Sequence, residues 1–225
     1  MNRFPARYKL PGFGVFASLL RMATEYGFTD VREALVEDLK GAYPTKFEDF
    51  EAARVLGEDV FGSPKPHPNA VLNLFVAQNV RFAIPFAYYR ASIGGFSALM
   101  SDQPGTVLPR HTLACAIYGM GMAQRMMPTT VRTISFVLNL TVCSDRSCIL
   151  NVDINPYERR TEAVGKLSDI MYGGRQGDVL SAPSLGGVTC ARCTAPLKLW
   201  HAACRSTCWG ILPTAFAVAK SWDEV

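Results

Sequence analysis

The apolar residues of the first 130 positions recur at the three- and four-residue intervals that are typical of amphipathic helices. One face of a predicted helix over residues 15–26 carries Phe16, Leu19, Leu20 and Ala23. Gly27 suits the left-handed position after a helix end, and Phe28 can pack back on the last turn. Thr29 then caps a second predicted helix, which ends at Gly41.

Further helices follow the same logic up to the middle of the chain. Thr45 and Glu48 have the spacing of a capping box, which predicts a third helix after them. The proline-rich segment 61–68 is a predicted stiff linker, because proline does not fit a helix interior. Beyond it, helices are predicted over residues 69–78, 86–91 (after a break at Pro85) and 109–127.

The pattern changes in the last third of the chain. Residues 133–142 alternate apolar and polar positions, which predicts one strand. A helix opened by Pro156, a loop over 173–189 and a last helix over 194–212 follow. We therefore predict a mainly α fold: an irregular helical assembly with a Cys-rich C-terminal lobe and at most one or two short strands. The expected division is a helical region over residues 1–130 and a Cys-containing lobe over 131–225 packed on it, or one continuous domain.

Charge and composition exclude some classes of protein. The chain has 225 residues, of which 49% are hydrophobic and 19% charged, an ordinary globular composition. Its net charge of +4 arises from basic residues that are scattered singly, so nucleic acid is an unlikely partner. The most apolar long segment, residues 70–89, contains Asn73, Gln78, Asn79 and Arg81. We therefore expect no membrane span.

Two short-spaced cysteine pairs carry the strongest chemical signal. Seven cysteines, none before Cys115, do not resemble a secreted disulfide scaffold, so we expect an intracellular protein, cytoplasmic or nuclear. Cys143 and Cys148, together with Cys190 and Cys193, can supply four thiolates to one tetrahedral Zn²⁺. Four thiolates would leave no position for water, so such a site would be structural. The alternative is that these cysteines are core residues.

Three more candidate ligands, His201, Cys204 and Cys208, lie at helical spacing in the last predicted helix. One of them could replace a ligand of the four-thiol site, but packing of the inner helix face is the favoured interpretation. The three histidines of the chain, His67, His111 and His201, fall in no catalytic motif, so we predict that the chain is not an enzyme. A thiol-redox role for Cys190 and Cys193 stays open, although no thioredoxin-like pattern surrounds them.

The order of these motifs resembles mushroom-type (basidiomycete) BTB/POZ-domain proteins, in the region that follows their BTB core. The matching motifs are Tyr26-Gly27-Phe28, Val31-Arg32-Glu33-Ala34-Leu35, Tyr43-Pro44-Thr45, Cys143 with Cys148, Cys190 with Cys193, Trp209-Gly210-Ile211-Leu212-Pro213-Thr214-Ala215-Phe216, and Trp222. Gly210 and Val218 depart from the family pattern, which has an acidic residue and a leucine there. The BTB core itself would be expected before residue 1.

The resemblance implies a non-enzymatic protein-interaction module of a fungal protein, the distal part of a BTB-type protein without its core. It also implies an adaptor role in a ubiquitin ligase. The partners are not identified by the sequence, and self-association through the apolar faces of the first two helices is expected. The alternative function is a zinc-supported nucleic-acid or chromatin-binding module, for which Arg192, Lys198 and Arg205 supply a sparse basic surface.

Overall fold

The computed structural model of the chain describes residues 10–55, 60–122, 143, 145, 148, 178, 180 and 189–225. The chain forms two compact units, Met1–Ile117 with Leu212–Val225, and Tyr118–Ile211. Helices account for 67% of the described residues, which contain no strand, so the predicted mainly α fold with a Cys-rich C-terminal region is confirmed. The predicted strand over 133–142, the helix opened by Pro156 and the boundary at residue 130 lie outside the described residues.

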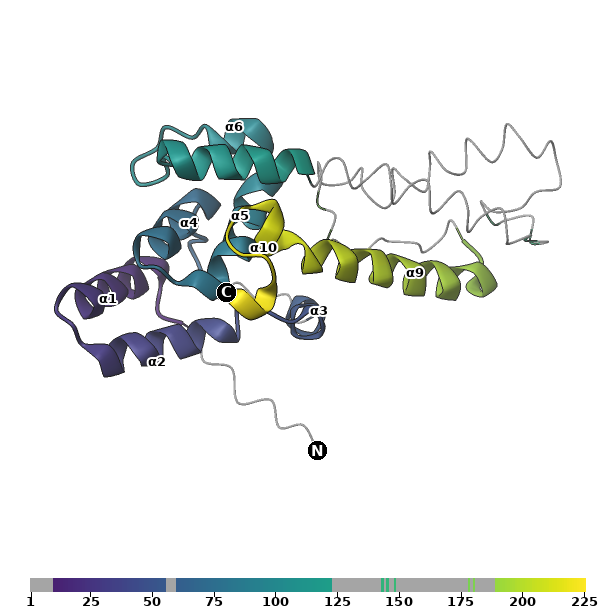
Figure 1. Cartoon of the computed structure of the whole chain (residues 1–225). Helices are drawn as coiled ribbons and strands as arrows, with labels where there is room; N and C mark the ends of the chain where they lie inside the picture. Colours follow the sequence, from purple (N-terminus) through teal and green to yellow (C-terminus); the bar gives the residue numbers. More distant parts are fainter. Residues whose placement is uncertain are drawn as a thin grey trace. The chain divides into compact units, whose positions relative to one another are not determined.

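Figure 1 shows the order of the elements along the chain. Their bounds are α1 Phe13–Glu25, α2 Thr29–Lys40, α3 Phe47–Val55, α4 Pro68–Ala77, the 3-10 helix η1 Arg81–Ala83, α5 Ile84–Ile93, α6 Gly95–Leu99, α9 Ala191–Gly210, α10 Leu212–Ala215 and the 3-10 helix η3 Trp222–Glu224. Residues 110–122 are also helical.

Helices α1 and α2 form a hairpin whose turn was predicted from Gly27. This glycine has φ +69°, the left-handed conformation that costs other residues free energy. The backbone N–H of Phe28 donates to the carbonyl oxygen of Ala23 at 2.8 Å, the bond that closes a Schellman motif. Helices α1 and α2 consequently pack against each other (Figure 1).

Two prolines of the first unit, Pro68 and Pro85, sit in the first turn of a helix. Pro68 is in the first turn of α4, where the His67 side chain accepts a hydrogen bond from the backbone N–H of Asn69. Pro85 lies in the first turn of α5, where its missing N–H leaves no bond unmade. The chain therefore bends before Pro85, at η1, and α5 begins at Ile84, two residues earlier than the predicted turn over 86–91.

An aromatic cluster occupies the core of the first unit, where α4 packs against α5. The ring of Tyr43 meets Phe75 edge-on, with centroids 4.8 Å apart, and lies 5.9 Å from the ring of Phe86. Phe50 reaches Phe86 from α3 at 5.4 Å. Burial raises the pKa of Tyr43 far above its ordinary value, so its hydroxyl stays neutral.

The C-terminal residues belong to the same unit. Helix α10 packs on α5, and the ring of Phe216 stacks on that of Tyr88 with centroids 5.2 Å apart. Ala217 has φ +55°, and the N–H of Val218 donates to the carbonyl oxygen of Pro213 at 2.9 Å. A Schellman-type turn therefore also ends α10, with alanine where glycine is usual.

Candidate metal centre

The site begins at the N-terminus of α9. Cys190 is the N-cap residue with an extended backbone, and its carbonyl oxygen accepts hydrogen bonds from the backbone N–H of Cys193 at 3.0 Å and of Thr194 at 2.9 Å. The Thr194 hydroxyl also donates to that oxygen, at 2.8 Å. The helix was predicted to start near Thr194 but starts at Ala191, because the Cys-x-x-Cys segment itself forms the first turn.

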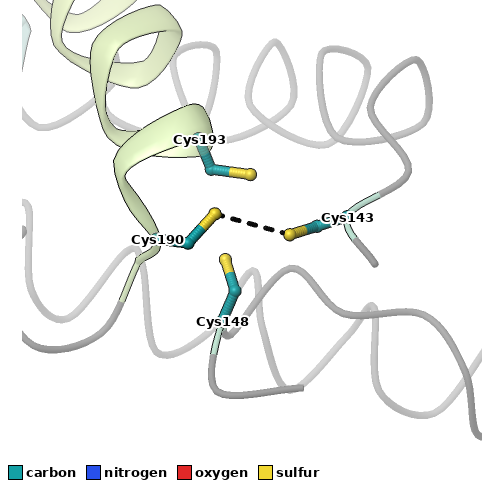
Figure 2. A group of neighbouring side chains, drawn as sticks. All are labelled: Cys143, Cys148, Cys190 and Cys193. Atoms are coloured by element: carbon teal, nitrogen blue, oxygen red, sulfur yellow. Dashed lines mark hydrogen bonds between the residues drawn. The ribbon is translucent and has the colours of Figure 1, made fainter. Parts of the chain in front are cut away.

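Four thiols converge in front of this turn. The Sγ atoms of Cys143, Cys148, Cys190 and Cys193 all lie within 4.8 Å of one another. Figure 2 shows the four side chains pointing toward a common centre, Cys190 and Cys193 from the start of α9 and the other two from a separate segment. The Sγ atoms of Cys143 and Cys190 are 3.5 Å apart, and all four cysteines are free. The structure therefore brings together the four cysteines named from the sequence.

These separations suit one tetrahedral metal ion. With Zn–S bonds of about 2.3 Å, the sulfurs of a regular tetrahedron lie about 3.8 Å apart. The 3.5 Å between Cys143 and Cys190 and the 4.8 Å limit bracket that value. Cys143, Cys148 and Cys193 are 4–8% exposed, so an ion at the centre would be largely shielded from water. The four cysteines can hold a metal ion.

Backbone N–H groups donate to two of the sulfurs, and each bond on its own favours the thiolate form. The N–H of Cys193 bonds to the sulfur of Cys190 and, together with neighbouring thiols, lowers the pKa of Cys190 to about 7. The N–H of Asp145 likewise lowers the pKa of Cys143, but burial and the thiols of Cys190 and Cys148 outweigh it, and the net pKa is raised. In both bonds an N–H group donates to sulfur, which favours the negatively charged thiolate that binds a metal.

All four thiols can ionise together only if a cation lies among them, because burial and the neighbouring thiols raise the pKa of Cys143 and Cys193. Burial, and then hydrogen bonds with the three neighbouring thiols, raise the pKa of Cys193 far above its ordinary value. Four adjacent negative charges repel one another, so the protein alone holds only part of the set as thiolates. A divalent ion held by Cys143, Cys148, Cys190 and Cys193 would supply the positive charge that favours all four thiolates.

The other candidate ligands on α9 lie outside this cluster. Among the described residues, the four cysteines are the only group of three or more potential ligands close enough to share an ion. His201 and Cys208 are buried on the inner face of α9, and Cys204 is half-buried. Burial raises the pKa of Cys208 to about 11, so it is a neutral thiol at physiological pH. This supports the packing interpretation of the three residues.

Arg205 is a buried residue that the sequence argument placed on the surface. It is 5% exposed, and its Nη1 donates to the carbonyl oxygen of Leu180 at 3.4 Å. The signal was available, because Arg205 lies four residues after His201 and three before Cys208, on the inner face of the helix. Its charge is therefore not available to a nucleic-acid phosphate.

No family model, curated protein or solved structure matches the chain. The site must be interpreted from its own geometry. Within the part of the chain that the structure describes, no helix combines the length and apolar character that crossing a bilayer requires.

Proposed function

We propose that this chain is a non-enzymatic protein-interaction module whose Cys-rich unit is held together by one structural zinc ion. The observation that carries the proposal is the convergence of Cys143 and Cys148 with Cys190 and Cys193. Four thiolates complete the coordination of Zn²⁺ and leave no position for a reactive water. The ion would join the start of α9 to a segment more than 40 residues away in sequence.

The proposal includes the fungal BTB-type relationship, with this chain as the distal part of such a protein and an adaptor role in a ubiquitin ligase. The order of its motifs along the sequence supports this. In the motif from Trp209 to Phe216, Trp209, Leu212 and Phe216 are 1–4% exposed. That burial gives the motif a structural role, as expected of residues that maintain a fold. Reduced thiols at a metal site suit an intracellular protein.

The nucleic-acid alternative has less support than the interaction role. Of the three basic residues it depended on, Arg205 is buried. Arg192 and Lys198 are exposed on α9, which leaves two positive charges rather than a basic face.

The test is the zinc content of the purified, reduced chain, measured by mass spectrometry of the metal. We expect one zinc per chain, and a loss of most of it in Cys190→Ser. Cys204→Ser is the matched control, because it removes a thiol of the same helix that lies outside the cluster. A folded chain without zinc, or an equal loss in both variants, would contradict the proposal.

A further inference from the structure

Helix α1 exposes an apolar line that its own unit does not cover. Val15, Leu19, Met22 and Tyr26 follow one another at intervals of four, three and four residues, and they are 40–64% exposed. The buried line of the same helix, Phe16, Leu20 and Ala23, is a separate one beside it. Intervals of four and three residues are those by which one helix pairs with another.

The line continues onto α2. Phe28 and Val31 share a helix face with Leu35 and Leu39, but the latter two are buried whereas Phe28 and Val31 are 55% and 47% exposed. The core of the unit therefore covers the apolar face of α2 at Leu35 and Leu39 but leaves the same face exposed at Phe28 and Val31. The rings of Tyr26 and Phe28 lie 6.1 Å apart and connect the two helices. We name these six exposed residues, Val15, Leu19, Met22, Tyr26, Phe28 and Val31, the α1–α2 stripe.

Acidic side chains border this stripe. Glu25 on α1, and Asp30 and Asp38 on α2, are exposed. Asp30 and Asp38, eight residues apart, fall on the helical line next to Val31. No ion pair among the described residues neutralises these three carboxylates.

The basic residues of the two helices offset only part of this negative charge. Residues 10–40 contain five acidic and three basic residues. Lys40 forms an ion pair with Glu37 at 2.6 Å. Four carboxylates then stand against two cations, the exposed Arg21 and the half-buried Arg32, whose guanidinium donates to the carbonyl oxygen of Gln78 at 3.1 Å and keeps its charge. The rim of the stripe is therefore acidic.

We infer that the α1–α2 stripe is a docking site for an amphipathic helix of a protein partner that carries Lys or Arg beside its apolar face. The inference rests on the proposed interaction role and names the chemistry of the partner. An apolar line accepts the apolar face of such a helix, and the acidic rim attracts its flanking cations. A second copy of the chain would bring the same acidic rim, which disfavours the self-association expected from the sequence, and an anionic lipid surface is disfavoured for the same reason.

The test uses the full chain and three synthetic 18-residue peptides, followed by fluorescence anisotropy. One is an amphipathic Leu–Lys helix, the second its Leu–Glu counterpart, and the third has the Leu–Lys composition in scrambled order. We expect the Leu–Lys helix to bind at least tenfold more tightly than the other two. Its affinity should fall as salt rises, because exposed charge pairs are screened.

Exposed residues allow substitutions that leave the fold intact. Met22→Gln should weaken binding of the Leu–Lys helix at least fivefold, while Leu199→Gln, which changes a residue 75% exposed on α9, should not. Asp30→Lys should weaken it as well, whereas Asp102→Lys makes the same charge change at an exposed position outside the two helices and should have no effect.

A second copy of the chain or a membrane at the α1–α2 stripe would give different results in these experiments. Equal binding of the Leu–Lys and Leu–Glu helices, or no binding at low salt, overturns the inference. So does a dimer in sedimentation velocity that tightens with salt and is lost in Met22→Gln, which would identify a second copy as the occupant. Binding to phosphatidylserine vesicles that Met22→Gln abolishes would identify a membrane instead.

Zinc content measured on the same samples separates the two proposals. One zinc per chain without peptide binding refutes the docking site alone. Peptide binding without zinc refutes the structural zinc ion and leaves the docking site standing.

Discussion

Asn69 shows how a single buried amide can hold a loop in place. It is fully buried on α4, and its Nδ2 donates to the carbonyl oxygens of Ala98, Leu99 and Thr106 at 2.9–3.3 Å. Asn69→Ala would remove this donor from the buried oxygens of Leu99 and Thr106, whereas the oxygen of Ala98 also accepts from the backbone N–H of Ser101 at 3.4 Å. We expect a loss of about 2–3 kcal/mol in the free energy of unfolding, because unpaired buried polar groups are costly. Urea denaturation of the variant measures it.

The control is Asn73→Ala, one turn further along α4. The Nδ2 of Asn73 donates to the carbonyl oxygens of Gly105 and Val107, but these bonds are exposed and water can replace them. The loss there should stay below about 1 kcal/mol. Equal losses for the two variants would show that burial does not set the energy of this network.

Cys190 should give the metal-free chain a distinct pH dependence when it is probed by a short alkylation pulse directly after zinc is removed, before the Cys-rich unit unfolds. Its pKa is lowered from an ordinary 9.0 to about 7, chiefly by the backbone N–H of Cys193. Its alkylation by iodoacetamide should therefore be half-maximal near pH 7 and level off above it, since the thiolate is the reactive form. The same shift stabilises the folded metal-free chain fully above pH 9, and this contribution is lost as pH falls through 7.

Peptide mapping by mass spectrometry measures the alkylation rate of each cysteine. Cys208, whose pKa burial raises to about 11, should react slowly throughout the range of pH 6 to 9. Zinc should protect Cys190 at every pH in that range. A Cys190 rate that still rises steeply at pH 9 in the metal-free chain would contradict the lowered pKa.

The Schellman turns at Gly27 and Ala217 give opposite predictions for the exchange of glycine and alanine. Gly27, at φ +69°, has open space around the position of a Cβ atom, so Gly27→Ala costs only backbone strain. We expect a loss of about 1 kcal/mol. Ala217 already carries that strain at φ +55°, so Ala217→Gly should stabilise the chain by about 0.5 kcal/mol, the relieved strain less the added entropy of the unfolded chain.

Thermal or urea unfolding of both variants measures these changes. A surface helix position is the control, for example Ser18→Ala on α1, which should change the stability by less than about 0.5 kcal/mol. The turn geometry would be contradicted if Gly27→Ala were neutral or if Ala217→Gly destabilised the chain.

The helices could largely be predicted from the sequence because their signals are local. Periodic apolar positions and Gly27 placed α1 and α2 to within two residues of their observed ends. The start of α9 was predicted near Thr194 instead of at Ala191, because the Cys-x-x-Cys turn does not have the apolar periodicity of a helix. The burial of Arg205 could have been predicted from its helical spacing to His201 and Cys208, but the exposure of the α1–α2 stripe depends on what packs against each helix face. That information comes from contacts between residues distant in sequence, which periodicity does not contain.

The candidate site was predictable in its residues but not in its geometry. The short spacing within each cysteine pair marks a ligand pair, and this is a local signal. That Cys143 lies 3.5 Å from Cys190 depends on how the chain folds between them. The two hydrogen bonds from backbone N–H groups to Cys143 and Cys190, which favour thiolates, also depend on the folded turns.

The division into two units predicts that zinc removal acts on one unit only. All four cysteines belong to the unit Tyr118–Ile211. A structural zinc contributes about 10–16 kcal/mol in small zinc-binding domains, which matches or exceeds the whole stability of a typical domain at about 5–15 kcal/mol. Chelation should therefore unfold this unit. The unit of α4 and α5 has its own aromatic core and should remain folded.

Hydrogen exchange followed by mass spectrometry resolves the two units in one sample. Adding a strong zinc chelator should accelerate exchange of the amides of α9 by orders of magnitude and leave those of α4 and α5 unchanged. Cys190→Ser should reproduce the effect without chelator, and Cys204→Ser should not. If α9 keeps its protection after the metal is removed, the four thiols are core residues, and packing alone stabilises that unit. If α4 and α5 lose protection together with α9, the two units unfold as one, and the zinc ion would stabilise the entire chain.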